Sequence, residues 1–279
     1  MPALVISIGP FAQEIAQQTA RIYLGSDPDR KKVTQFITLG EGEKSPFDLL
    51  PLPLSKAEES RVILPKPVSA GERQAFIEKL VKSADQIRAS MANVVHQLRA
   101  HKDLIKIDLD QRLEKSVNQF IIADLVDPIA AAALLPLSFL LQDINNSHPN
   151  TRSHLLLNTA ILPNENDLDN QDEAALFHRL QELDQVLISI KDQKHLNLLK
   201  AMGIQERVPL TIPVYLFDHR KPNYNNVKDK GELQRIFSNS LISLLSGNLT
   251  DTIFQNRPIG YVQKQHTFYQ SVGAANLIY

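Results

Sequence analysis

Two points in this chain, each where an apolar strand-like run meets a helix, have residue types that could bind a phosphate. The first is Gly9, which follows the apolar run Leu4–Ile8 and precedes an amphipathic helix. A glycine at such a turn lets a phosphate approach the backbone, and a helix N-terminus attracts negative charge. Here Pro10 removes an amide donor, Phe11 adds bulk, and Glu14 places a carboxylate near the expected phosphate. The turn favours a structural role over phosphate binding.

The second point is the end of the apolar run Gln119–Val126, where Asp124 and Asp127 lie just before a long apolar helix. Two carboxylates at a strand end could bind a metal ion together with a phosphate. The alternative is structural: Asp127 caps the helix, with Pro128 at its first position, and Asp124 pairs locally or faces solvent. No glycine lies between Gly71 and Gly203. A phosphate cradle needs close backbone approach, so the pattern favours the structural alternative.

A third set of polar residues follows the strand-like run Leu210–Asp218. The segment "FDHRKPNYNN" contains Asn223 and Asn225, whose amides could recognise a base or a partner, although a plain solvated loop has the same composition. The sequence has no G-x-x-x-x-G-K-[ST] phosphate loop, no H-E-x-x-H zinc motif and no G-x-S-x-G nucleophile turn. No motif in the chain therefore establishes a reaction.

Strand-like and helical patterns alternate along the chain, and this order predicts the elements that position these residues. The alternation indicates an α/β fold, Rossmann-like, with a mostly parallel sheet and helices on both faces. We expect one domain over residues 1–279, with a proline-rich irregular insertion at about 41–70 and one long helix over Gly71–His101. The last residue lies in an apolar run, so we expect the chain to be the front part of a longer protein.

Composition narrows the classes of function. The chain has 279 residues, 43% hydrophobic and 22% charged, with a formal net charge of −1. This balance argues against a nucleic-acid partner, which needs a basic face. The absence of cysteine excludes disulfides, zinc–thiolate sites and cysteine nucleophiles, and it fits a cytoplasmic location. The apolar run 129–141 is too short to span a membrane and contains Pro136, so it predicts a buried helix.

In its order of elements the chain resembles the nucleotide-binding half of the tubulin and FtsZ superfamily, and most of all the divergent tubulin-like proteins of bacteria. The resemblance is carried by Val5–Leu24, Gln119–Gln142, Leu210–Asp218 with its asparagine loop, and the closing "TFYQSVGAANLIY". The family's phosphate loop reads G-G-x-T-G-[ST]-G before its central helix. The matching residues, Val126 to Ala132, retain neither its glycines nor its threonine. The resemblance implies the fold and self-association, but not GTP hydrolysis.

Three hypotheses of function follow. The first is a non-catalytic scaffold or assembly module, a pseudo-GTPase without cofactor that acts through protein–protein contacts as a homo-oligomer or a subunit of a larger complex. The second is a divergent nucleotide-binding protein, GTPase-like if it is an enzyme, which binds GTP with Mg²⁺ through Gly9, Phe11, Asp124, Asp127, Asn223 and Asn225. The third is a dinucleotide-dependent enzyme with Glu41 or Glu43 at the ribose.

Overall fold

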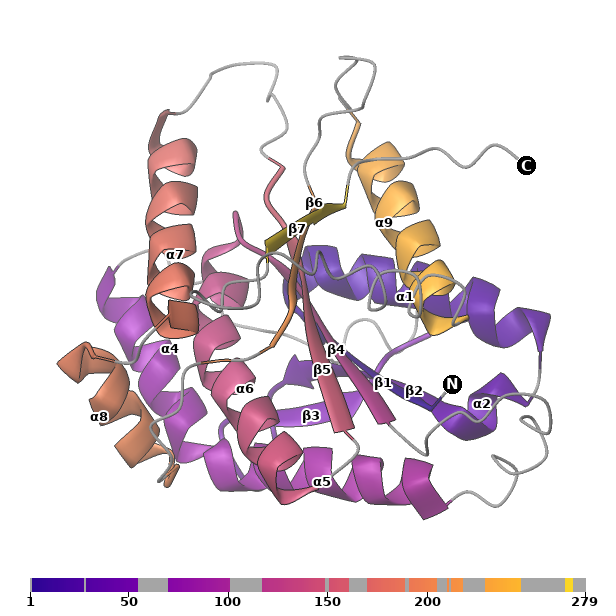
Figure 1. The fold of residues 1–279 in the computed structure, drawn as a ribbon, viewed down its shortest axis with the longest axis horizontal. Helices are drawn as coiled ribbons and strands as arrows, with labels where there is room; N and C mark the ends of the chain where they lie inside the picture. The colour runs from indigo at the N-terminus through magenta and orange to yellow at the C-terminus, as the bar shows by residue number, and fades with distance from the viewer. Residues whose placement is uncertain are drawn as a thin grey trace, which may run out of the picture.

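A seven-stranded sheet forms the centre of the protein (Figure 1). The structure is a computed structural model that describes residues 2–27, 29–54, 70–100, 117–148, 151–160, 170–188, 191–204, 210, 212–217, 229–246 and 269–272. The strand order is β3-β2-β1-β4-β5-β6-β7, and every neighbouring pair is parallel except β2 with β3. The predicted α/β class with a mostly parallel sheet is therefore confirmed. The strands are β1 (Ala3–Ile8), β2 (Thr34–Gly40), β3 (Asp48–Pro51), β4 (Val117–Asp124), β5 (Thr151–Asn158), β6 (Val214–Phe217) and β7 (Tyr269–Val272).

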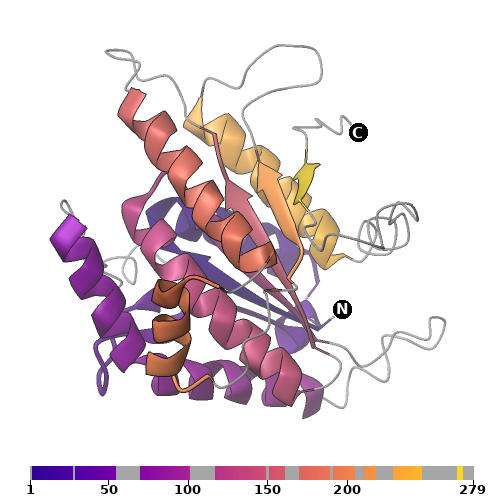
Figure 2. The same cartoon turned by 60° about the vertical axis from the view of Figure 1, so that its left-hand side comes forward.

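Helices cover both faces of this sheet (Figures 1 and 2). One face packs against α1 and α9, and the other packs against α4, α5, α6, α7 and α8. Figure 2 shows α6, α7 and α8 together on the near face, with β7 at the edge of the sheet beside β6. The helices are α1 (Gly9–Ser26), α2 (Arg30–Val33), α4 (Ala70–Lys82), α5 (Ala84–Ala100), α6 (Pro128–Ser147), α7 (Asn170–Ile188), α8 (Gln193–Ala201) and α9 (Lys230–Leu245).

Alternation along the strands divides the apolar side chains between two cores. In β4, Phe120 and Ile122 point towards α1 and α9, whereas Ile121 and Ala123 point towards the α4–α8 face. All four are fully buried. Successive side chains of a strand point to opposite faces, so an unbroken apolar run is what a strand covered on both sides requires.

The predicted long helix over Gly71–His101 is wrong in one respect, because the structure has two helices that meet at Ser83. The Ser83 hydroxyl accepts a hydrogen bond from the Phe47 amide at 2.9 Å and donates one to the Lys79 carbonyl at 3.0 Å. A contact to a residue 36 positions away therefore accompanies the break, and Ser83 with Gln86 three residues later has the S-x-x-Q pattern of a helix start.

The irregular insertion predicted at 41–70 is also only partly correct. Residues 48–51 form β3, an antiparallel edge strand paired with β2. Pro51 is tolerated because it is the last residue of an edge strand, where a missing amide donor disturbs no central ladder. Residues 55–69 of the insertion lie outside the described residues.

Helix α6 is the central buried helix that the apolar run predicted. Within the described part of the chain it is the one helix long and apolar enough to cross a membrane by composition, but 78% of its most apolar window is buried inside the protein. Asp127 caps it by accepting a hydrogen bond from the Ile129 amide at 2.8 Å, and Pro128 is its first residue. Its position is that of a core helix between the sheet and α4, α5 and α8.

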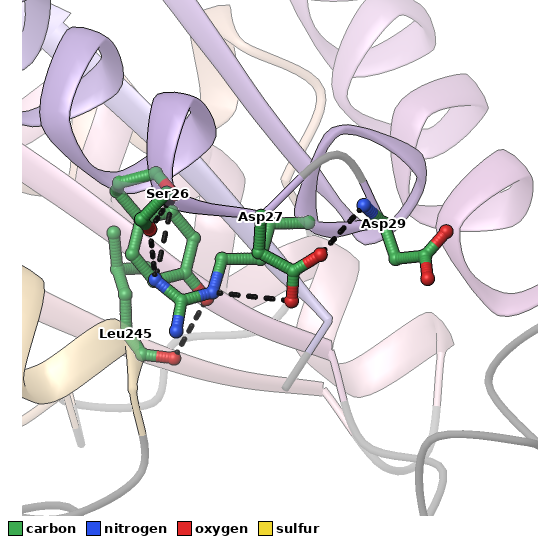
Figure 3. Close-up of polar contacts among 6 residues, drawn as sticks. Ser26, Asp27, Asp29 and Leu245 are labelled. Atoms are coloured by element: carbon green, nitrogen blue, oxygen red, sulfur yellow. Dashed lines mark hydrogen bonds and ion pairs between the residues drawn. The ribbon is translucent and has the colours of Figure 1, made fainter.

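Figure 3 shows how the far end of α1 is fixed to α9. The Tyr23 hydroxyl donates to the Leu245 carbonyl at 3.1 Å, and the Arg30 guanidinium lies 4.4 Å from the centre of the Tyr23 ring. Arg30 also donates to the Ser26 hydroxyl at 2.8 Å and pairs with Asp27. Burial raises the pKa of the Tyr23 phenol, so its proton remains available for this bond. The junction holds α1 and α9 together, so that both stay packed on one face of the sheet.

Candidate functional site

The candidate site lies where the strand order reverses, at the carboxyl ends of β1 and β4. Helix α1 follows β1 on one face of the sheet, and α6 follows β4 on the other. The two strands are paired in register up to Ile8 and Ala123, which places Gly9 beside Asp124. In open α/β sheets, ligands bind in the crevice outside the strands at this reversal. The structure therefore brings together the two points that the sequence singled out separately.

Gly9 is a buried glycine with a positive φ of 83°, and it is the first residue of α1. A Cβ atom built on Gly9 would lie only 2.6 Å from the Asp127 Oδ2 atom. Glycine is thus required at this position for two reasons. Its backbone is left-handed, and the Asp127 carboxylate leaves no room for a side chain. Its presence is explained by the structure without a phosphate.

Replacing Gly9 with alanine is expected to lower the free energy of unfolding by about 2 kcal/mol, because a side chain is strained at positive φ and would clash with Asp127. Gly25→Ala is the matched control. Gly25 also lies in α1, and its Cβ would meet nothing within 4 Å. Urea denaturation of both variants checks this. Equal stability of the two variants would contradict the close approach at Gly9.

Asp124 lies half-buried at the end of β4 and is held by its neighbours on the chain and on the next strand. Its Oδ1 atom accepts hydrogen bonds from the Val126 amide and from the Asn158 Nδ2 atom, both at 3.0 Å. Burial raises the pKa of this carboxyl above its usual value, and these two hydrogen bonds oppose the rise. Asp124 therefore pairs locally, as the structural alternative predicted.

The amides of the loop between β4 and α6 are all bonded inside the protein. The Leu125 amide donates to the Asn158 carbonyl at 2.9 Å, and the Val126 amide donates to the Asp124 side chain. The Asp127 amide donates to the Asp124 carbonyl at 3.2 Å, and the Ile129 amide donates to the Asp127 side chain. The remaining position is Pro128, which has no amide hydrogen. A phosphate cradle consists of free backbone amides, and residues 125–129 have none to offer.

The carbonyls of the same loop are bound by an arginine from α7. The Arg179 Nη1 atom donates to the Leu125 carbonyl and, at 2.8 Å, to the Val126 carbonyl. A guanidinium that bonds two adjacent carbonyls fixes their direction. The loop thus directs carbonyl oxygens at the Arg179 cation. A phosphate-binding loop does the opposite, because it directs amide hydrogens at an anion.

Phe11 belongs to the core between the sheet, α1 and α9 and is only 8% exposed. The Lys230 ammonium, at the start of α9, lies 5.9 Å from the centre of its ring and 3.2 Å from the Glu14 carboxylate. Phe11 thus packs inside the protein and is covered by a cation of α9.

The sequence predictions for this site have mixed outcomes. Gly9, Asp124 and Asp127 lie together, and Asp127 is the predicted helix cap. Asn223 and Asn225 lie outside the described residues. Within the described part of the chain, no group of three or more histidine, aspartate or glutamate side chains is arranged to hold a metal ion. Glu41 and Glu43 are exposed after β2.

Two residues of the site were missed in the sequence. Asn158 ends a strand with the pattern "LLLN", a polar residue after an apolar run, and Asp124 ends its strand in the same way. That signal could have identified Asn158. Arg179 lies inside a helix 53 residues after Val126, and no local pattern distinguishes it from other surface arginines.

Comparison with known proteins gives matches in structure alone. No protein-family model matches the chain, and no curated protein matches it. Two solved structures are similar in fold, both of TubZ from Clostridium botulinum phage c-st. The form with a truncated C-terminal tail has 12% identity and a TM-score of 0.40, covering 88% of this chain and 62% of that one. The other has 13% identity and a TM-score of 0.40, covering 96% and 63%.

The chain spans about three-fifths of the length of the TubZ structures.

Proposed function

We propose that the protein is a non-catalytic scaffold or assembly module, a pseudo-GTPase built on a nucleotide-binding type of fold, which acts in the cytoplasm through protein–protein contacts. The observation that carries this proposal is the loop between β4 and α6, whose amides are all bonded within the protein or absent. Binding a phosphate there would break hydrogen bonds that already hold the end of β4 and the start of α6.

GTP with Mg²⁺ is the cofactor of the alternative that the resemblance suggests, and the residues at the site do not fit it. The Ile129 backbone amide already donates to Asp127, and the Asn158 side-chain amide donates to Asp124, so neither donor is free for a phosphate. Arg179 binds the carbonyls of the same loop. Asp124 and Asp127 add negative charge beside the expected position of a phosphate, which is itself anionic.

The alternative is a divergent nucleotide-binding protein, and one observation favours it. Helix α1 has no side-chain cap from its own N-cap residue, Ile8. The first turn of a helix carries amides without intrahelical partners, and these attract anions. Pro10 removes one of these donors, and Phe11 is committed to the core. The first turn is therefore a weaker site than a glycine-rich loop.

We expect purified protein to bind neither GTP nor ATP with Mg²⁺ in titration calorimetry, because the loop after β4 offers no free amide. Native mass spectrometry of the same sample should show no nucleotide mass on the 31.3 kDa chain. It should show self-association or a retained protein partner, unchanged by nucleotide. Nucleotide binding at micromolar affinity would overturn the proposal, and so would a strictly monomeric protein that retains no partner.

A further inference from the structure

We propose that the Asp127 carboxylate is a built-in substitute for an anionic ligand, placed between the starts of α1 and α6. The inference rests on the proposed function and deepens it, since it says what holds the site closed. Asp127 Oδ1 accepts a hydrogen bond from the Ile129 amide at 2.8 Å in the first turn of α6. Its Oδ2 lies against Gly9, at the position where any Cβ on that residue would collide. One carboxylate thus lies at both helix starts.

The electrostatics of this position suit an anion. The two helices have 18 and 20 residues, and each carries a partial positive charge of about half an elementary charge at its N-terminus. Helix α6 is capped by Asp127, whereas Ile8 gives α1 no side-chain cap. Neither helix has an acidic residue in its own first turn. The Asp127 carboxylate therefore lies where its charge can balance both positive ends.

The close contact between the Asp127 carboxylate and Gly9 also closes the site to an external anion. The space above Gly9, which the missing Cβ leaves open, is filled by the carboxylate. A glycine at this turn normally admits a ligand to the backbone. Here it admits a side chain from the next loop. The site is then permanently occupied by a side chain of the protein itself.

The test removes this internal anion and asks whether an external one takes its place. Asp127→Gly deletes the carboxylate, and glycine is an acceptable N-cap residue. Asp127→Asn keeps the volume and removes the charge. Asp192→Gly is the matched control, because Asp192 caps α8 by accepting from the Lys194 amide at 2.9 Å but lies at the start of only that helix. Urea denaturation is measured in sodium phosphate and in sodium chloride at equal ionic strength.

We expect phosphate to stabilise Asp127→Gly more than the wild type, Asp127→Asn or Asp192→Gly. At a phosphate concentration ten times its Kd, the ratio of folded to unfolded Asp127→Gly should rise about elevenfold over its value in chloride. An equal response of Asp127→Gly and Asp192→Gly would overturn the inference. If Asp127→Gly does not fold, Asp127→Ser takes its place, since serine caps a helix without charge.

The outcome is separable from that of the proposed function. Nucleotide binding by the wild type would contradict the proposed function, whatever the variants do. If the wild type binds no nucleotide and phosphate does not stabilise Asp127→Gly more than Asp192→Gly, the proposed function is retained and the role of Asp127 is refuted.

Discussion

Replacing His154 with phenylalanine is expected to make the protein markedly more resistant to acid. His154 is 2% exposed and stacks on Phe120, with ring centres 5.0 Å apart, and it also contacts the Tyr215 ring. Burial, with a smaller effect of the Arg152 charge, lowers the pKa of His154 from 6.5 to about 3. The imidazole is therefore a neutral ring in the apolar core, and phenylalanine can take its place in the stack.

The sign of the effect follows from which state binds the proton. Below pH 6.5 the unfolded chain protonates His154, whereas the folded protein does not until about pH 3, so stability is full above pH 6.5 and falls as pH decreases. At pH 4 the loss attributable to His154 is about 3 kcal/mol. Urea denaturation from pH 7.5 to 4 should give a shallower decline for His154→Phe. His96→Gln, which removes an exposed imidazole of α5, is the control and should decline like the wild type.

Much of the fold could be predicted because its causes are local in the sequence. Apolar runs such as Phe120–Ala123 require burial on two faces, and the Asp127–Pro128 pair specifies a helix start. At Ser83 the S-x-x-Q pattern of a helix start was the local signal, whereas the contact of Ser83 with the Phe47 amide from a distant loop has no signal in the sequence. Single hydrogen bonds between remote segments leave no periodic signal.

The candidate site was predicted only in part for the same reason. Strand ends marked by polar residues identified Gly9, Asp124 and Asp127, and parallel pairing then brought them together. Which polar groups the loop presents depends on its hydrogen bonds to Asn158 of β5 and Arg179 of α7. Both residues are remote from the loop in the sequence. The sequence showed that glycines were missing. It could not show that the amides of residues 125–127 and 129 are bonded to other acceptors within the protein.

Replacing Arg179 with methionine is expected to destabilise the protein by about 3 kcal/mol, because hydrogen bonds from a charged donor are strong and the Leu125 and Val126 carbonyls would lose their partner. Methionine keeps much of the side-chain length, so packing changes are small. The loss should be accompanied by a further rise in the pKa of Asp124, because the Arg179 charge is one of the groups that lower it. Urea denaturation and NMR titration of the carboxyl measure the two effects.

Arg235→Met provides the matched comparison, since Arg235 is exposed on α9 and a surface substitution typically changes stability by at most about 0.5 kcal/mol. Arg179→Lys should be intermediate, because an ammonium keeps the charge but cannot reproduce the planar donor geometry of a guanidinium. If Arg179→Met were as stable as Arg235→Met, Arg179 would not hold the loop closed. The loop would then be held only by the bonds of its own amides to Asp124, Asp127 and Asn158, and the permanently closed site would lose one of its two supports.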